Sequence, residues 1–334
     1  MSRGIDETVS TPSPRLPLLA LRLEFEVQKD AQFWCYSGSV WRGYFGARLR
    51  RMVCATGEPR CDGCDLRGEC AYAYLFDTAP PANAPRMRKY NSVPHPLVLA
   101  PPPEMGARLY PAGSRYPLDV RLFGRACDYA ALVAQALALV GRDGPGAKGA
   151  PLRLARIHSA QLSEGEVIEY LPGRAIPVEP ACPEMPPCPD HPVEIRLMTP
   201  LRLVAGGRVV GPDRLTFRVL FSSLLRRISM LTVFHTDHPL ETDFAGLVKR
   251  SETVRIETER LRWREWKRRS ARQNRLVPMG GIAGRITVDL AGAEALWPYL
   301  WLGQWTHVGK GAIMGLGRYV ISADIPSSNT KCKK

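Results

Sequence analysis

The segment from Leu171 to Pro192 constrains the fold of this chain most strongly. It contains eight prolines. Proline has no backbone N–H and fixes its own φ, so a segment this rich in proline cannot form a regular helix or a central strand. The composition therefore predicts an interdomain linker or a surface loop over 171–192. This segment divides the 334-residue chain into two parts of ordinary domain size.

The part before this segment predicts strands mixed with helices. Leu18 to Val27 alternates in polarity, as in a strand with one buried face formed by Leu21, Leu23, Phe25 and Val27. An apolar helix is predicted from Tyr129 to Val140, with Asp128 as its N-cap and Gly141 at its end. The remaining predicted elements are a helix over 40–53, strands over 118–123 and 152–158, and a glycine-rich loop over 142–150.

The part after the proline-rich segment repeats this order, beginning with a strand from Val193 to Met198. A repeat of strand, helix and strands favours an α+β fold with two similar halves, such as two ferredoxin-like (RRM-like) domains in tandem. The predicted boundaries are a disordered tail over 1–17, a first domain over 18–170, the linker over 171–192, a second domain over 193–325 and a basic tail over 326–334.

The charge of the chain indicates a polyanionic partner, because the formal net charge is +14 and the isoelectric point is about 9.6. No apolar run reaches the length of about 18 residues that would suggest a membrane span. The N-terminal residues lack the apolar core of a signal peptide, so we expect a cytoplasmic protein without a membrane partner. Nine cysteines in a reducing compartment do not predict a disulfide framework.

A glycine-rich loop over residues 303–318 is the most informative functional motif. It combines four closely spaced glycines with a lysine and an arginine. Glycine lets a backbone approach a ligand closely, and successive N–H groups in such a loop can hold a phosphate. In a basic chain this pattern indicates RNA contact through Gly309, Lys310, Gly311, Gly315, Gly317 and Arg318. A tight structural turn near the end of a domain is the alternative interpretation.

This loop resembles the C-terminal glycine-rich signature of the RAMP superfamily of CRISPR-associated RNA-binding proteins, and specifically its pre-crRNA-processing endoribonucleases. Further segments resemble that family in the same order, namely 38–46 in the first-domain helix, 217–235 in the second-domain helix, and 262–273 and 279–284 after it. The resemblance implies tandem ferredoxin-like domains that bind CRISPR repeat RNA and crRNA. It also leaves other CRISPR effector subunits open as partners.

The largest charge imbalance lies between Lys249 and Arg275, where eleven Lys or Arg stand against four Glu. Arginine binds phosphates with a fork of N–H donors, and tryptophan can stack on bases. We expect Trp263 and Trp266 to pack inward. The basic residues expected to contact RNA are Arg262, Arg264, Lys267, Arg268, Arg269, Arg272 and Arg275. The alternative is a solvated helix face.

Four closely spaced cysteines predict a metal-binding insertion in the first domain, over residues 54–70. The pattern is Cys54-x6-Cys61-x2-Cys64-x5-Cys70. Four thiolates can close a tetrahedral site around Zn²⁺, and the same set can hold a [4Fe–4S] cluster. Over these residues alone, the spacing also resembles the iron–sulfur loop of endonuclease III-like DNA glycosylases. We expect a structural role, because four thiolates leave no open position on zinc.

RNA cleavage without a metal needs groups that transfer protons and groups that stabilise a phosphorane. Histidine suits proton transfer at neutral pH, and lysine suits charge stabilisation. His235 follows the helix of the second domain and His307 opens the glycine-rich loop, and both match positions in the RAMP family pattern. Each has a structural alternative as a hydrogen-bonding group. The first-domain helix has no histidine, so Tyr36, Tyr44 and Lys310 complete the catalytic candidates.

Together these features predict a metal-independent endoribonuclease that cleaves CRISPR repeat RNA (pre-crRNA) into crRNAs. The resemblance implies products with 2′,3′-cyclic phosphate and 5′-OH ends. The alternative is a non-catalytic RAMP subunit that binds crRNA within an effector complex. A third class, a metal-stabilised nucleic-acid-binding module unrelated to CRISPR, would share only the charge and the cysteines.

Overall fold

The computed structural model describes residues 13–78, 93–159, 167–270 and 275–322. Arg272 and the predicted basic tail over 326–334 therefore lie outside the described residues, and the side chains of Arg269 and Arg275 are not described. The predicted N-terminal tail extends too far, because Leu16 is fully buried in the core. In the described part of the chain, no helix is long and apolar enough to cross a membrane.

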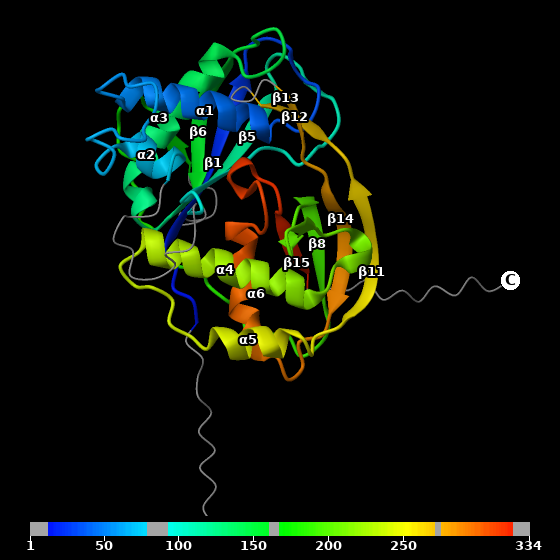
Figure 1. Cartoon of the computed structure of the whole chain (residues 1–334). Helices are drawn as coiled ribbons and strands as arrows, with labels where there is room; N and C mark the ends of the chain where they lie inside the picture. Colours follow the sequence, from blue (N-terminus) through cyan, green and yellow to red (C-terminus); the bar gives the residue numbers. More distant parts are fainter. Residues whose placement is uncertain (1–12, 79–92, 160–166, 271–274, 323–334) are drawn as a thin grey trace, which may run out of the picture.

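The first domain is built on an antiparallel sheet of five strands (Figure 1). In chain order the strands are β1 (Leu18–Val27), β3 (Leu97–Ala100), β5 (Arg115–Phe123), β6 (Leu152–Ser159) and β7 (Ile168–Glu169). Their spatial order is β3-β5-β1-β6-β7. Helix α1 (Gly38–Val53) lies between β1 and β3 in the sequence, and α3 (Ala130–Asp143) lies between β5 and β6. This β-α-β-β-α-β order is that of a ferredoxin-like domain.

Shorter elements lie between these. Helix α2 (Ala71–Phe76) follows the cysteine-containing loop, and a 3₁₀ turn (Gly124–Tyr129) precedes α3. Strands β2 (Ala31–Phe33) and β4 (Arg108–Tyr110) pair with each other outside the main sheet.

Helix α3 differs from its predicted ends. The 3₁₀ turn before it makes Tyr129 the N-cap residue, so Asp128 does not have the predicted capping role. Gly141 lies inside the helix on its buried face, where an added Cβ would be 2.8 Å from the ring of Phe25. The helix ends at Asp143, and the C-cap residue Gly144 adopts a positive φ of 76°. Gly141 is therefore explained by close packing on β1 rather than by helix termination.

The second domain repeats the same order with four strands. They are β8 (Val193–Leu201), β11 (Ile256–Arg264), β14 (Gly281–Val288) and β15 (Tyr319–Ser322), in the spatial order β11-β14-β8-β15. Helix α4 (Phe217–His235) follows β8, α5 (Phe244–Ser251) follows α4, and α6 (Trp297–Thr306) follows β14. Two hairpins are formed by β9 (Val204–Ala205) with β10 (Arg208–Val209) and by β12 (Lys267–Ser270) with β13 (Arg275–Pro278). Short 3₁₀ turns occupy Pro212–Arg214, Glu294–Leu296 and Ala312–Met314.

The two domains share a hydrophobic core. Leu18, Ala20 and Phe123 from the first sheet belong to the same cluster as the buried face of α4. The other face of the first sheet packs on α1 and α3. The first four residues of β1 are all buried, which explains why this end of the strand is apolar without alternation.

The proline-rich segment lies against both domains. Ala181 forms an isolated bridge with Leu18 of β1. Farther along, the indole N–H groups of Trp297 and Trp301 donate to the carbonyls of Pro186 and Glu184, at 2.8 and 2.7 Å. These contacts hold the proline-rich segment against the surface of both domains.

Candidate nucleic-acid interface

The glycine-rich loop packs between the two domains. Its glycines have positive φ values from 66° to 86°, at Gly309, Gly311, Gly315 and Gly317. A Cβ at Gly315 would overlap the hydroxyl of Tyr36 and approach the backbone of Ala100, both in the first domain. Tyr36 in turn donates a 2.8 Å hydrogen bond to the carbonyl of Met314. The loop therefore joins the second domain to α1 and β3 of the first.

Burial changes the role expected for part of this loop. Gly315 and Gly317 are buried, and their N–H groups donate to carbonyls of the loop itself and of β8. They shape the loop, whereas the sequence suggested direct contact with RNA. Gly309 and Gly311 are half-buried and Lys310 is exposed. The first part of the loop is therefore accessible to a ligand.

A pocket beside this exposed part collects four cationic side chains. Arg202 follows β8, Arg226 and Arg227 lie on α4, Lys310 lies on the loop, and Pro94 of the first domain lines one side. The pocket has a volume of about 220 Å³. A water occupies about 30 Å³ of liquid volume, so the pocket has room for a phosphate group with some of its water. No carboxylate of the described residues lines it, and this charge favours an anionic ligand.

Arg227 is the most deeply placed of these cations. Its Nε donates a 2.7 Å hydrogen bond to the carbonyl of Thr306. Its Nη2 is buried and has no hydrogen-bond partner within the described ranges. Burial lowers the pKa of this guanidinium to about 10, so the group stays charged at neutral pH. A buried cation without a counter-charge costs stability, and an anion in the pocket would relieve that cost.

The sequence alone did not identify Arg202, Arg226 and Arg227 as binding residues. Arg202 lies far from the other two in the sequence, and Lys310 lies farther still. The signal that could have found them is the pair of adjacent arginines within α4, a helix that otherwise carries mostly apolar residues. Two adjacent charges in the middle of such a helix indicate a surface that contacts a partner.

The basic segment forms strands rather than a helix face. Strand β11 lies at the edge of the second sheet. Arg262 is exposed and Arg264 is half-buried. They project to the same face of the strand, because side chains alternate along it. Trp263, which was expected to pack inward, remains 38% exposed, and its indole N–H donates to Glu265 at 2.8 Å.

The hairpin β12–β13 lies over the first domain near α1 (Figure 1). Trp266 is buried, as expected, and packs edge-to-face on Tyr36 with ring centroids 5.8 Å apart. Lys267 is exposed, and the Nε of Arg268 is buried without a partner among the described residues. Burial lowers the pKa of Arg42 on α1, and repulsion by Arg268 lowers it further. The hairpin and α1 thus place positive charge on both sides of the domain boundary.

Arg318 belongs to an ion-pair cluster between the domains. Its Nη1 lies 3.4 Å from Asp119, which is 4% exposed and also accepts a 2.7 Å hydrogen bond from Arg22. Burial raises the pKa of Asp119, but the hydrogen bond from Arg22 and the charges of Arg121 and Arg318 outweigh it, so the pKa is lowered. Arg318 therefore connects the start of β15 to the first sheet, in addition to the RNA contact expected from the sequence.

His235 and His307 are buried hydrogen-bonding groups. Nε2 of His235 lies 2.9 Å from the carbonyl of Pro94, and Nδ1 of His307 lies 3.3 Å from that of Leu316. Burial lowers the pKa of His235 to about 4 and lowers the pKa of His307 well below its usual value. Both rings are therefore neutral and shielded from solvent at neutral pH. This geometry favours their structural alternative over proton transfer.

The other three catalytic candidates do not lie together. Tyr36 is buried beneath the loop, and burial raises its pKa. Tyr44 is 48% exposed on α1. Lys310 lines the cationic pocket, which His235, His307 and the two tyrosines do not. The five residues therefore do not form one site in this structure.

His95 is a further histidine near the cationic pocket. Its ring stacks on Phe76 of α2 at 6.1 Å, and the preceding residue, Pro94, lines the pocket. Burial lowers the pKa of His95 to about 3, and the positive charges of Arg42 and Arg227 contribute to the same shift. His95 is half-buried, unlike His235 and His307. No sequence motif had pointed to it.

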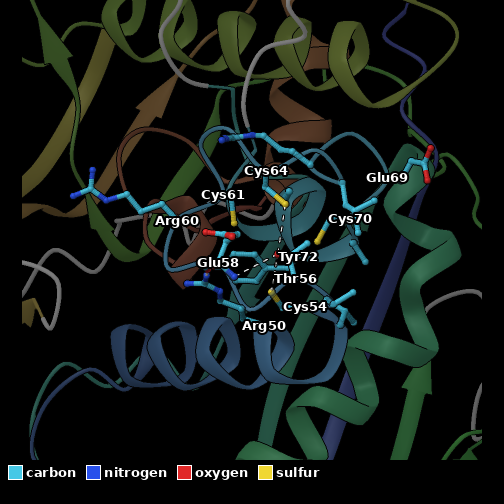
Figure 2. A pocket seen from close by; sticks show the side chains of 16 residues that line it. Arg50, Cys54, Thr56, Glu58, Arg60, Cys61, Cys64, Glu69, Cys70 and Tyr72 are labelled. Atoms are coloured by element: carbon cyan, nitrogen blue, oxygen red, sulfur yellow. Dashed lines mark hydrogen bonds between the residues drawn. The ribbon is translucent and has the colours of Figure 1, made fainter.

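The four cysteines of the predicted insertion line a second pocket, in the loop between α1 and α2 (Figure 2). All four are free thiols. As the side chains stand, no group of three or more Cys, His, Asp or Glu in the described part of the chain is arranged to hold a metal ion. The predicted insertion is thus present as a cluster of thiols, and not as a preformed metal site.

Two protein families match the chain. Residues 195–319 match the family described as CRISPR-associated endoribonuclease Cas6, and residues 16–178 match a family described as an N-terminal domain, AF_1859_N. No curated protein matches the sequence.

Solved structures of Cas6 proteins share the fold. A Cas6 product complex is 21% identical with a TM-score of 0.56, over 92% of this chain and 100% of that one. Thermus thermophilus Cas6 is 18% identical with a TM-score of 0.52, over 92% and 99%. A partial Cas6-RT-Cas1–Cas2 complex is 16% identical with a TM-score of 0.57, over 96% of this chain but 48% of that longer one. Identities this low show the shared fold and leave the chemistry to be argued from the site.

Proposed function

We propose that this chain cleaves CRISPR repeat RNA into crRNAs. Residues 195–319 match the CRISPR-associated endoribonuclease Cas6 family, in line with the resemblance found in the sequence. The scissile phosphate binds in the cationic pocket. The 2′-OH beside it attacks the phosphorus, and the 5′-oxygen leaves. The products carry a 2′,3′-cyclic phosphate and a 5′-OH, and no metal ion takes part in the reaction.

The observation that carries this proposal is the cationic pocket formed by Arg202, Arg226, Arg227 and Lys310. Attack by the 2′-OH gives a phosphorane with more negative charge than the bound phosphate. Fixed cations around that charge stabilise the transition state more than the ground state. In a half-buried pocket the attraction is also stronger than in bulk water. The unpaired Nη2 of Arg227 supplies a donor that protein groups in the described ranges do not use.

The basic ribbon, β11 with the hairpin β12–β13, supplies a second RNA contact. Arg202 lines the cationic pocket, and its Nη1 also donates a 2.6 Å hydrogen bond to the carbonyl of Gly280, directly after the ribbon. The two surfaces therefore adjoin. Arg262, Lys267 and Arg268 are suited to the phosphates that lead to the cleaved bond, and contacts of this kind set position more than sequence preference.

Proton transfer is assigned to His95 in this proposal. Its Nδ1 lies 3.3 Å from the Thr78 hydroxyl. A bound phosphate would counter the positive charges of Arg42 and Arg227. Burial is the largest cause of the lowered pKa of His95, and the phosphate offsets only the smaller contribution of these charges, which raises the pKa from about 3.

Single-turnover cleavage of repeat RNA by the full chain tests the role of the cationic pocket. Arg226→Ala and Lys310→Ala should each slow cleavage about 100-fold or more, as expected when one group that stabilises transition-state charge is lost. His95→Ala should slow cleavage by roughly 100-fold with RNA affinity nearly unchanged, because a proton-transfer group acts mainly in the transition state.

Arg218→Ala is the matched control. Arg218 is an exposed arginine on the same helix α4, but it pairs with Glu252 at 2.8 Å and lies outside the cationic pocket. Its variant should cleave at the wild-type rate. Wild-type protein that binds repeat RNA tightly and leaves it intact would instead indicate a crRNA-binding subunit without activity.

A further inference from the structure

The loop between α1 and α2 folds around its cysteines. From residue 54 to residue 70, every residue is exposed except Arg67 and the four cysteines. A segment that buries no large apolar side chain gains little from the hydrophobic effect, and small units of this kind commonly depend on a metal or a disulfide. In this loop the four thiols take the position that apolar side chains have in a hydrophobic core. They line one pocket of about 350 Å³ (Figure 2).

The backbone brings the thiols to this pocket. Cys54 directly follows α1, and Cys70 directly precedes α2. Between them, the N–H of Cys64 donates to the carbonyl of Cys61 at 3.2 Å and closes a tight turn. Gly63 lies in that turn with φ of 81°, and no atom lies within 4 Å of the position its Cβ would take. Glycine is therefore required there by the turn and not by packing.

Two arginines hold the loop to the neighbouring helices. Arg50 on α1 donates to the carbonyls of residues 58 and 59. Arg67 pairs with Asp62 in the loop and with Asp77 directly after α2. Both arginines line the same pocket as the thiols. Positive charge beside a thiol favours the thiolate, which is the form that binds metals.

We propose that Cys54, Cys61, Cys64 and Cys70 bind one metal centre through four thiolates. Two of the thiols already flank the Thr56 hydroxyl, which lies 4.0 Å from Sγ of Cys54 and 3.7 Å from Sγ of Cys64. Binding contracts the pocket, because the side chains as they stand are not arranged around an ion. Zn²⁺ and a [4Fe–4S] cluster share this donor chemistry, and four protein ligands make the centre structural.

The centre would stabilise a part of the first domain that adjoins the proposed RNA site. It connects the end of α1 to the start of α2. Phe76 of α2 packs on Phe45 of α1. The guanidinium of Arg42 lies 4.5 Å from the centre of the Phe76 ring. Phe76 also stacks on His95. Loss of the metal should therefore loosen α2 and displace Arg42 and His95, although metal binding itself does not depend on RNA cleavage.

Metal analysis of the full chain, purified without oxygen, tests the proposal. We expect about one zinc or about four irons per chain, and the visible absorption of an iron–sulfur cluster distinguishes the two. Cys61→Ser and Cys64→Ser should lose the metal and lower the unfolding temperature, because the binding free energy of a structural metal is part of the folding free energy. Cys182→Ser, at an exposed cysteine outside the cluster, should keep both.

A second measurement uses wild-type protein, so it tests the proposal even where the cysteine variants fail to fold. Wild-type protein is stripped with a chelator and then supplied with Zn²⁺, or with iron and sulfide under reducing conditions. One of these additions should restore the unfolding temperature of the untreated protein. Metal-free protein, as purified, whose unfolding temperature responds to neither addition would overturn the proposal. Disulfide bonds among the four cysteines in protein purified under reducing conditions would overturn it as well.

Discussion

Burial determines which single residues at the domain boundary carry charge. Arg227 keeps its charge at neutral pH even with a pKa of about 10, and its Nη2 has no partner in the described part of the chain. The neighbouring His235 is buried and neutral, with a pKa of about 4. The positive charge of the pocket is therefore left for a ligand. His235 instead fixes the end of α4 to Pro94 by a hydrogen bond.

The lowered pKa of His235 predicts a pH dependence of stability. Between about pH 6.5 and about pH 4 the unfolded chain binds a proton at this histidine and the folded chain does not. The free energy of unfolding should therefore fall as the pH drops through this range. Burial shifts the pKa values of His95 and His307 in the same direction, so they add to the effect. Chemical denaturation at several pH values measures it.

The variant His235→Gln isolates this contribution. When the pH is lowered from about 7 to about 5, the free energy of unfolding should fall in both proteins. The fall should be roughly 2 kcal/mol smaller in the variant than in the wild type. His238→Gln, at an exposed histidine of the following loop, is the control and should follow the wild-type curve. If His235→Gln also follows the wild-type curve, the buried, neutral state of His235 is wrong.

Strand β11 and the hairpin β12–β13 are expected to act as one RNA-binding element. Replacing Arg262, Lys267 and Arg268 together with alanine should weaken RNA binding and reduce the log–log salt slope by about two units, if each contacts a phosphate. Binding measured over a range of salt concentrations tests this. The triple alanine variant of Lys249, Arg250 and Arg255, exposed residues on or after α5, should keep the wild-type slope. An unchanged slope in the first variant would show that the basic ribbon does not contact the RNA.

The sequence predicted those elements whose pattern is local. Alternation located β1, the apolar run located α3, and a strand was also predicted at the position of β6. The pairing of β12 with β13 was not predicted, because their basic residues follow neither a helical nor a strand period. Their position depends on Trp266, which packs on Tyr36 from the other domain. The end of α3 was misplaced for a similar reason, since Gly141 is needed where the helix meets Phe25.

The candidate site is formed by segments of both domains. The cationic pocket takes residues from the end of β8, from α4, from the glycine-rich loop and from the segment before β3. Sequence motifs found Lys310 in this set but not the arginines, because only the fold brings those segments together. The same holds for the loop itself, whose buried Gly315 packs against the first domain. A shared core and the Tyr36–Met314 hydrogen bond keep the two domains in this arrangement.

The reaction with repeat RNA tests the central claim most directly. Full-length protein, in excess over CRISPR repeat RNA and in the presence of EDTA, should cut the RNA at one position. Mass spectrometry of the fragments should identify a 2′,3′-cyclic phosphate on one and a 5′-OH on the other, and a single 2′-deoxy substitution at the cut position should abolish cleavage. Intact RNA after prolonged incubation, or cleavage that survives the 2′-deoxy substitution, would contradict the account.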